Sequence, residues 1–398
     1  MQNTSFSGHP IIRQILSYIN KEEVNRTAEK HKSDRYSKRF KTWDHLATML
    51  FSVVSGCNSL REVESIILAC EGKLEHLQLK TPPKRSTLAD ANRRRSSKVF
   101  ADIYYGLVAR YKHVLSDSSI KTAVKNLLII DSTTISLFSD ILKGAGRNPI
   151  NGKKKGGIKA HVMLKALMDL PTFVNFTSAA THDHVFLQEL NSLPKGTFLV
   201  FDKAYVDYVQ YAEWTKQGVY FVTRLKDNAV YEKLEEPELD ESVDNRVLID
   251  EKIKLETKQN ESIELRRVAF YDDEKHKTYV FITNNFELNA DKVAEIYKNR
   301  WQIEIMFKRL KQKFPLKYFL GDSQNAIEIQ IWACLIMQLI ILVINHKLKK
   351  KWAFSNLVSI VRYHLTSYIN LIKFLENPNK TWDQLKTKPP NQLELFAI

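Results

Sequence analysis

Apolar and polar positions divide the chain into a helical first part, a strand-rich middle part and a helical last part. Apolar residues recur at helical spacing over residues 42–55, 59–70 and 87–111. Gly56 and Gly72 follow the first two stretches, and glycine often ends a helix because it accepts left-handed backbone. The pattern therefore predicts three helices joined by short turns.

Short, continuously apolar runs replace the helical spacing after residue 125. They have the composition of β-strands and cover residues 126–130, 158–167, 171–179, 197–201 and 219–225, with helical segments at 181–190 and 207–217. Three antiparallel strands, followed by alternating helix and strand, predict an α/β fold with a ribonuclease-H-like mixed sheet flanked by helices. Residues 227–287 interrupt this order with short, charged, β-branched runs, which predict a small β insertion.

Residues 289–314 contain neither glycine nor proline, which predicts one long helix. Tyr297, Arg300, Glu304 and Lys311 then fall within a sector of about 60° on a helix that turns about 100° per residue. An apolar stripe beside this sector consists of Ile296, Ile303, Phe307, Leu310 and Phe314. A carboxylate at the edge of a buried stripe is held rigidly and still reaches a cleft. The alternative is an ordinary exposed face with an Arg300–Glu304 ion pair one turn apart.

The charge of the chain is strongly positive and unevenly distributed. The net charge is +15, which is common among proteins that bind nucleic acid. Residues 1–125 contain 22 Lys and Arg against 12 Asp and Glu, a net of +10, whereas residues 227–287 contain 9 against 17, a net of −8. One acidic segment therefore lies inside a basic protein.

Arginine is concentrated in the third predicted helix. Arg93, Arg94 and Arg95 lie in its first turns, and phosphate contact requires positive charge close to the DNA backbone. Short turns between helices, the last of them rich in arginine, predict a helical DNA-binding domain ahead of the sheet. A Gly- and Lys-rich segment at 143–157 is predicted to be flexible, basic and suited to lie along phosphates. A helical bundle with a solvated basic face is the alternative.

Cysteine usage and the apolar runs bear on the compartment. Three widely spaced cysteines form no metal-ligand pattern and indicate a reducing environment. The start of the sequence has no basic and apolar leader, so the expected location is the cytoplasm. The most apolar run, 327–344, includes Glu328 and two glutamines, which favours a helix buried in protein over a membrane span.

Three acids are the candidate catalytic groups. Asp131 and Asp202 end two neighbouring predicted strands, and Glu304 lies on a later helix, so this fold order brings the three carboxylates to one end of the sheet. Such oxygen ligands suit Mg²⁺, with Mn²⁺ as a substitute, and two ions can clamp the attacking and leaving oxygens of a phosphoryl displacement. Asp131 is expected to bridge both ions, and the other two acids to hold one each. A loop cap is the alternative for any one acid alone.

The spacing Tyr297-x-x-Arg300-x-x-x-Glu304, followed by Lys311, resembles the Y-x-x-R-x-x-x-E-x(6)-K motif of DDE transposases of insertion-sequence family four. The strand ends LLIIDSTT and FLVFDKAY resemble that family's motifs around its first and second aspartates, and the resemblance covers about residues 125–345. It implies a ribonuclease-H-like core with a β insertion and Mg²⁺-dependent cut-and-paste transposition, commonly through a hairpin at the transposon end. The implied partners are double-stranded DNA, as terminal inverted repeats and target, and a second subunit in a synaptic homodimer near the bacterial nucleoid.

The same resemblance assigns roles around the acids, which become the metal ligands. Arg300 and Lys311 are expected to hold phosphates near the transposon end, and Tyr297 to help place the DNA backbone. Better-studied members stack a flipped base on a tryptophan of the insertion, but residues 215–300 contain none here. Another aromatic face can stack a base, and the candidates are Tyr220, Phe221, Tyr231, Phe270, Tyr271 and Tyr279.

These predictions divide the chain into five segments. They are a helical N-terminal DNA-binding domain (1–120), the first part of the catalytic core (121–226), the β insertion (227–287), the catalytic helix with the remainder of the core (288–345) and a C-terminal helical region with a tail (346–398). Two other functions stay open, a stand-alone metal-dependent nuclease and a catalytically dead repressor derived from a transposase. Strand joining would separate transposase from nuclease, and the complete set of acids and cations argues against a dead copy.

Overall fold

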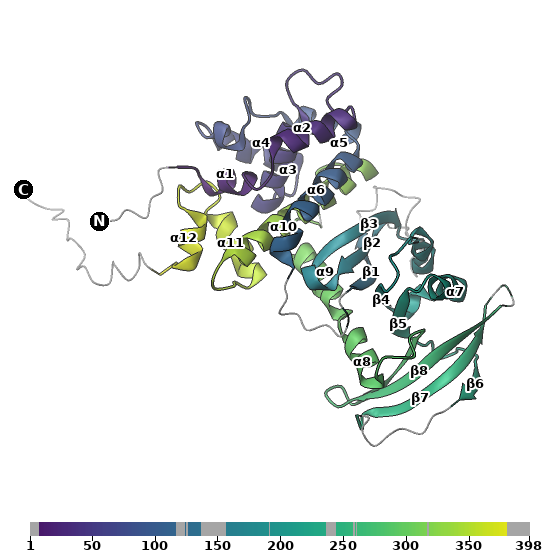
Figure 1. Ribbon diagram of the computed structural model, residues 1–398. Helices are drawn as coiled ribbons and strands as arrows, with labels where there is room; N and C mark the ends of the chain where they lie inside the picture. The colour runs from purple at the N-terminus through teal and green to yellow at the C-terminus, as the bar shows by residue number, and fades with distance from the viewer. Residues whose placement is uncertain are drawn as a thin grey trace, which may run out of the picture. The chain divides into compact units, whose positions relative to one another are not determined.

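The computed structural model describes residues 8–116, 124, 126–136, 157–190, 192–235, 244–257, 259, 261–316 and 318–379 (Figure 1). The chain divides into two compact units. The helical unit consists of Met1–Val114 and Gln312–Ile398, and the sheet unit consists of Leu115–Lys311. Apart from Gly157, the Gly- and Lys-rich segment at 143–157 lies outside the described residues.

The helical unit is built from helices of both chain ends. They are α1 (Ile11–Leu16), α2 (Lys21–Lys30), α3 (Thr42–Ser55), α4 (Leu60–Leu68), η1 (Leu74–Leu77), α5 (Arg85–Arg94), α6 (Ser97–Leu115), α10 (Gln324–Lys347), α11 (Phe354–Tyr363) and α12 (Leu371–Glu376). The first two predicted helices are confirmed as α3 and α4. Gly56 ends α3 in the left-handed region, with φ 82°.

The third predicted helix is two helices, α5 and α6, which separate at Arg95. Arg95 is extended, with φ −76° and ψ 127°. The side chain of Asn325 in α10 donates Nδ2 to the carbonyls of Asn92 and Arg95, both at 2.7 Å, and accepts the N–H of Ser97 at 2.9 Å. These bonds satisfy backbone groups that the break would otherwise leave free. Because the partner is distant in the chain, no local sequence pattern reveals the break.

The apolar helix α10 is the centre of the helical unit. It is apolar around its whole circumference and packs against α3, α5 and α11. The hydroxyl of Ser323 caps it by accepting the N–H of Ala326 at 3.2 Å. By length and composition α10 could cross a membrane, but 94% of its most apolar stretch is buried inside the protein. This agrees with the prediction of a protein-buried helix.

The sheet unit is built on a mixed sheet which, in the described part of the chain, has nine strands in the order β3-β2-β1-β4-β5-β9-β8-β7-β6. Its strands are β1 (Leu127–Ser136), β2 (Gly157–Lys165), β3 (Leu170–Ser178), β4 (Phe198–Phe201), β5 (Tyr220–Arg224), β6 (Glu232–Glu235), β7 (Val247–Glu256), β8 (Ser262–Asp272) and β9 (Lys277–Thr283). β1 pairs antiparallel with β2 and parallel with β4, and β4 pairs parallel with β5. The predicted order is confirmed to residue 225, except that η3 (Asp183–Glu189) is a 3-10 helix.

The segment predicted as a β insertion continues this same sheet. β9 pairs antiparallel with β5, and β8, β7 and β6 follow outward as antiparallel neighbours. Pairing with β9 satisfies the backbone groups that β5 would otherwise expose at its edge. The core and the added strands therefore share one continuous hydrogen-bonded ladder.

Different helices cover the two faces of the sheet. Leu128 and Ile130 of β1 pack with Trp214 of α7 (Tyr208–Lys216) on one face. Because side chains alternate along a strand, Asp131 points to the opposite face. There α8 (Ala290–Lys298) packs against β4, β5, β8 and β9. The first aspartate therefore faces the helices that follow the added strands.

The predicted helix at 289–314 is two helices, α8 and α9 (Trp301–Lys313), with Asn299 and Arg300 between them. Asn299 Nδ2 donates to the carbonyls of Glu295 at 3.0 Å and Ile296 at 3.4 Å, which helps to end α8. The predicted apolar stripe is confirmed, since all five of its residues are buried. The polar row is therefore placed by two helix ends and not by one continuous helix.

Candidate active site

Asp131 and Asp202 are neighbours in the register of two parallel strands. β1 and β4 pair up to Ile130 and Phe201, so the two aspartates are the next residues along each chain. The prediction that Asp131 ends its strand is wrong, because β1 continues to Ser136 through its pairing with β2. The β-branched residues after Asp131 favour this longer strand. The ladder with β4 does stop at the aspartates, and both therefore lie where the two parallel strands stop pairing.

Arg300 connects the first aspartate to the glutamate. Its Nη1 donates to Oδ2 of Asp131 at 3.2 Å, and its Nη2 donates to Oε1 of Glu304, one turn later in α9. The side chains are shielded from water, with exposed fractions of 17% for Arg300, 18% for Asp131 and 33% for Glu304. Charge-assisted bonds of this kind are about twice as strong as neutral hydrogen bonds. The structure thus brings Asp131 and Glu304 together through one shared arginine.

Burial dominates the electrostatics of these acids. It raises the pKa of Asp131 to about 6; the N–H of Ser132 and the charge of Arg300 oppose the shift, and Asp202 and Glu304 add to it. Burial lowers the pKa of Arg300, but Tyr297, Asp131 and Glu304 outweigh this effect, so that the pKa is raised. The site therefore holds more negative charge than one guanidinium neutralises, which favours the binding of a further cation.

A second polar network lies on the other face of β1. Ser132 donates Oγ to Oδ1 of Asp183 in η3 at 2.7 Å, while its N–H donates to Oδ1 of Asp131 at 2.8 Å. Lys159 of β2 is 5% exposed and donates Nζ to the same Asp183 oxygen at 3.1 Å. His161 is buried beside it, and burial lowers its pKa to about 4. Sequence reasoning missed this network because its members come from three elements that no motif links.

Tyr297 is partly buried, whereas Lys311 is exposed. The ring of Tyr297 packs on Phe281 of β9, with centroids 4.9 Å apart, and the guanidinium of Arg300 lies 5.8 Å from its centre. Burial raises the pKa of Tyr297. Lys311 donates Nζ to the carbonyl of Thr134 at 3.0 Å, and burial lowers its pKa. Lys311 is thus anchored on β1, the strand that carries the first aspartate.

An exposed tryptophan follows Arg300 in the chain. Trp301 begins α9 directly after Arg300, and 59% of its surface is exposed. The segment 215–300, in which a stacking tryptophan was expected by resemblance, ends one residue before it. A large aromatic side chain exposed to water directly after an arginine in a partly buried ion pair is a candidate contact for a ligand.

The six predicted stacking aromatics differ in their surroundings. Phe221 is fully buried in the sheet core, which removes it from the set. Tyr279 of β9 is partly exposed and has three cations near its ring, at 5.2 Å for Arg224 and 5.8 Å each for Lys275 and Lys277. An aromatic face among cations suits a base with its phosphates. Tyr279 is therefore the favoured member of the set.

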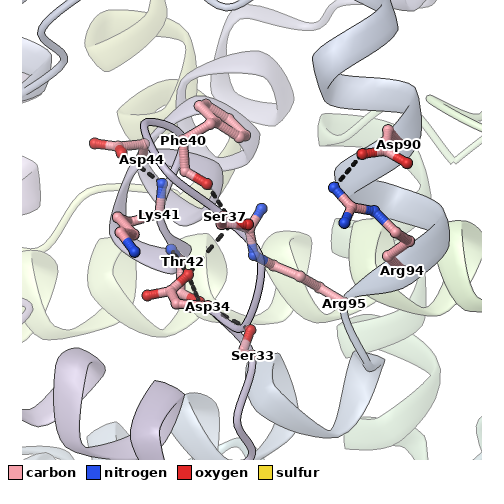
Figure 2. Close-up of polar contacts among 10 residues, drawn as sticks. All are labelled: Ser33, Asp34, Ser37, Phe40, Lys41, Thr42, Asp44, Asp90, Arg94 and Arg95. Atoms are coloured by element: carbon pink, nitrogen blue, oxygen red, sulfur yellow. Dashed lines mark hydrogen bonds and ion pairs between the residues drawn. The ribbon is translucent and has the colours of Figure 1, made fainter.

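The three predicted DNA-binding arginines differ in exposure. Arg93 and Arg94 are exposed, and Arg94 pairs with Asp90 inside α5 (Figure 2). Arg95 is only 4% exposed and binds Asp34 at 3.3 Å. We therefore correct the prediction for Arg95, because its guanidinium is enclosed by protein groups and is not presented to a phosphate.

The acids fit a divalent metal in chemistry, although Arg300 now holds two of them. Within the described residues, no three His, Cys, Asp or Glu side chains are placed to hold a metal ion together. Three carboxylates with oxygen donors are nevertheless the ligands that Mg²⁺ and Mn²⁺ prefer. Burial raises the pKa of Asp131, and a metal ion would stabilise the ionised form of this desolvated carboxylate.

A mixed sheet with two aspartates at the point where its parallel strands stop pairing defines an α/β protein with a candidate site at that edge. Residues 122–340 match the family model of the transposase DDE domain. Residues 7–80 match a domain of unknown function, DUF4372. The chain therefore belongs to the transposase DDE domain family.

Individual relatives agree with this family. The putative transposase y4zB of Sinorhizobium fredii is 31% identical over 67% of this chain and 73% of its own length. The probable transposase for insertion sequence element IS5377 of Geobacillus stearothermophilus is 28% identical over 62% of this chain and 64% of its own length. The putative transposase for insertion sequence element IS4SA of Synechocystis is 28% identical over 64% of this chain and 70% of its own length. The predicted resemblance to DDE transposases of insertion sequences is thereby confirmed.

Proposed function

We propose that the protein is the DNA transposase of an insertion sequence, which cleaves the transposon ends and joins them to target DNA. The observation that supports this most directly is the bonding of Arg300 to both Asp131 and Glu304, with Asp202 next in register to Asp131. Three antiparallel strands followed by two strands parallel to β1 are also the order of a ribonuclease-H-like core.

Asp131, Asp202 and Glu304 are the groups that would hold Mg²⁺, or Mn²⁺ in its place. When bound, the metal supplies stabilisation of the charge that develops on the phosphate oxygens. The chain's own residues prepare this site. Ser132 orients the Asp131 carboxylate through its N–H, and Arg300 neutralises part of its charge. The planar fork of Arg300 also suits a phosphate, which competes with the carboxylates for its donors.

DNA contacts are proposed around these acids. Lys311 presents its ammonium at β1, where it is suited to a phosphate of the transposon end. The ring of Tyr297 contacts Phe281 of β9 and the guanidinium of Arg300, and Tyr297 is suited to place the sugar–phosphate backbone. Trp301 and Tyr279 offer ring faces on which bases can stack, and either would serve a hairpin step.

The experiment is a cleavage assay with Glu304→Gln on the DNA that flanks the gene. We expect the variant to lose nicking in Mg²⁺ by about a thousandfold or more, while its affinity for the same ends stays within about twofold. Glu295→Gln, on the neighbouring helix α8, is the matched control and should cleave normally, since Glu295 pairs with Lys292. Cleavage retained by Glu304→Gln would overturn the proposal.

The products distinguish transposase from the other two functions. Joined strands in the presence of target DNA identify a transposase, whereas nicks without joining identify a stand-alone nuclease. Binding without any nick would identify a repressor. We also propose that two subunits hold the paired ends. Two-colour end pairing that rises with the square of protein concentration would support this, and first-order behaviour would oppose it.

A further inference from the structure

The segment 32–41, between α2 and α3, carries a dense group of exposed cations. We call it the basic loop. Its ten residues include five Lys or Arg and a single acid, Asp34. The cations are all exposed and are Lys32, Arg35, Lys38, Arg39 and Lys41. Among the described residues, none of the four cations before Lys41 forms a salt bridge. Their charge therefore faces solvent unneutralised.

The basic loop is held by a buried arginine. Arg95 extends from the end of α5 into the loop and donates Nη2 to Oδ1 of Asp34, to Oγ of Ser37 and to the carbonyl of Phe40 (Figure 2). Asp34 also accepts the N–H and the hydroxyl of Thr42, at 2.7 and 2.9 Å, at the start of α3. The one acid of the loop, Asp34, therefore bonds to other groups of the protein. These bonds fix the loop, and its cations remain exposed to solvent.

The backbone of the basic loop has two residues in a strained conformation. Lys32 and Tyr36 are in the left-handed region, with φ 51° and 63°, which L-residues with a side chain seldom adopt. Tyr36 is 81% exposed, and the guanidinium of Arg35 lies 4.9 Å from its ring centre. A large aromatic ring carried outward among cations gives the loop a face that can pack on a sugar or a base.

We propose that the basic loop is a DNA-backbone contact of this protein, and that Arg95 is the positioning residue that builds it. This gives a role to part of the matched domain of unknown function, residues 7–80. The partner is duplex DNA because closely spaced cations with an adjacent aromatic ring match the regular charge of a phosphate backbone. The inference rests on the proposed function. In it, the basic loop contacts DNA directly, and Arg95 only holds the loop in place.

The test is the salt dependence of DNA binding by the full-length protein. The triple variant Arg35→Ala, Lys38→Ala, Arg39→Ala removes three exposed charges that take no part in the bonds of Arg95 to Asp34, Ser37 and Phe40. We expect its affinity for a short duplex to fall about 10–100-fold, and the slope of log affinity against log salt to fall by about two to three. The matched control is the triple variant Arg61→Ala, Lys80→Ala, Lys84→Ala, which removes three exposed charges elsewhere in the helical unit. It should change the slope by less than about one.

The outcomes separate this inference from the proposed function. If the wild type cleaves its ends and the loop variant binds DNA as tightly as the wild type, the loop proposal fails while the transposase stands. If the wild type neither binds nor cleaves, the proposed function fails. Equal losses of DNA affinity in the two triple variants would show that the effect comes from net charge alone, and this result would also overturn the loop proposal. Loss of affinity for polyglutamate alone, with DNA binding intact, would point to an acidic protein partner instead.

A second variant tests the positioning role of Arg95. Arg95→Lys keeps the charge but lacks the planar fork that reaches Asp34, Ser37 and Phe40. We expect a lower salt slope for DNA binding and faster proteolytic cleavage within residues 32–41. An unchanged slope in a folded variant would show that Arg95 supports the helices alone.

Discussion

Asp131 shows how the charge of one residue sets the character of the site. Its carboxylate is 18% exposed and pairs with Arg300, yet burial still raises its pKa to about 6. A folded pKa above the unfolded value of 3.8 means that the folded protein binds this proton more tightly. The contribution of Asp131 to the free energy of unfolding is therefore fully present below about pH 4 and is lost as the pH rises through about 6.

Asp131→Asn should accordingly stabilise the metal-free protein at neutral pH. We expect the free energy of unfolding of the variant, minus that of the wild type, to be about 2–3 kcal/mol higher at pH 7.5 than at pH 4. Urea unfolding at the two pH values measures this difference, and an equal difference at both would contradict it. Addition of Mn²⁺ should raise the melting temperature of the wild type, chelation should reverse the rise, and the variant should not respond.

At the scale of elements, α10 carries two buried glutamines with opposite surroundings. Gln330 accepts the N–H of Leu320 at 2.7 Å and donates Nε2 to the carbonyls of Pro315 at 2.5 Å and Tyr318 at 2.9 Å. Gln338 is equally buried, but neither polar atom of its amide has a hydrogen-bond partner within the described residues. The first amide organises the segment before α10, whereas the second imposes a desolvation cost.

The same substitution should therefore have opposite effects at these two positions. Gln330→Leu should destabilise the protein by about 2–4 kcal/mol, because a buried N–H and two carbonyls lose their partner. Gln338→Leu should stabilise it by about 1–2 kcal/mol, because it removes a buried unpaired amide at similar volume. Denaturant unfolding of the full-length variants measures both, and each variant is the control for the other. Destabilisation at position 338 would mean that this amide has an unseen partner.

Features set by local sequence were predictable, and features set by distant partners were not. The apolar stripe beside the polar row follows from helical periodicity, and its five residues are buried as expected. The break after α5 depends on Asn325, which is 230 positions from Arg95. Arg95 failed as a predicted DNA contact for the same reason, since Asp34 is 61 positions away. The break after α8 is an exception, because the Asn299 side chain that helps to end α8 bonds to local carbonyls.

The candidate acids were found by strand order, but their geometry required the structure. An apolar run followed by an aspartate identified Asp131 and Asp202, although β1 continues past the first of them. The shared bonds of Arg300 depend on the turn between α8 and α9, which the pattern of a continuous helix conceals. Asp183 and Lys159 had no motif, because a network that spans β1, β2 and η3 has no fixed spacing in the chain.

At the scale of the whole molecule, charge is divided between a basic first segment and acidic added strands. Residues 1–125 have a net charge of +10 and residues 227–287 a net charge of −8. The acidic strands belong to the same sheet as the strands that precede Asp131 and Asp202. Acidic groups near DNA repel its backbone, so their effect on binding should be opposite in sign to that of the basic loop and should weaken with salt.

Substitution of three exposed acids, Glu235→Gln, Asp273→Asn and Glu274→Gln, tests this division of charge. We expect non-sequence-specific DNA affinity to rise about 2–5-fold at low salt, because the long-range repulsion is reduced. The gain should vanish near 0.3 M salt, where the Debye length is about 6 Å. Fluorescence anisotropy across a salt series measures it, beside an exchange of three exposed glutamines or asparagines for alanine as a control. A gain that persists at high salt would mean that these acids hold the sheet in a conformation unfavourable to DNA, and not that they act through their charge.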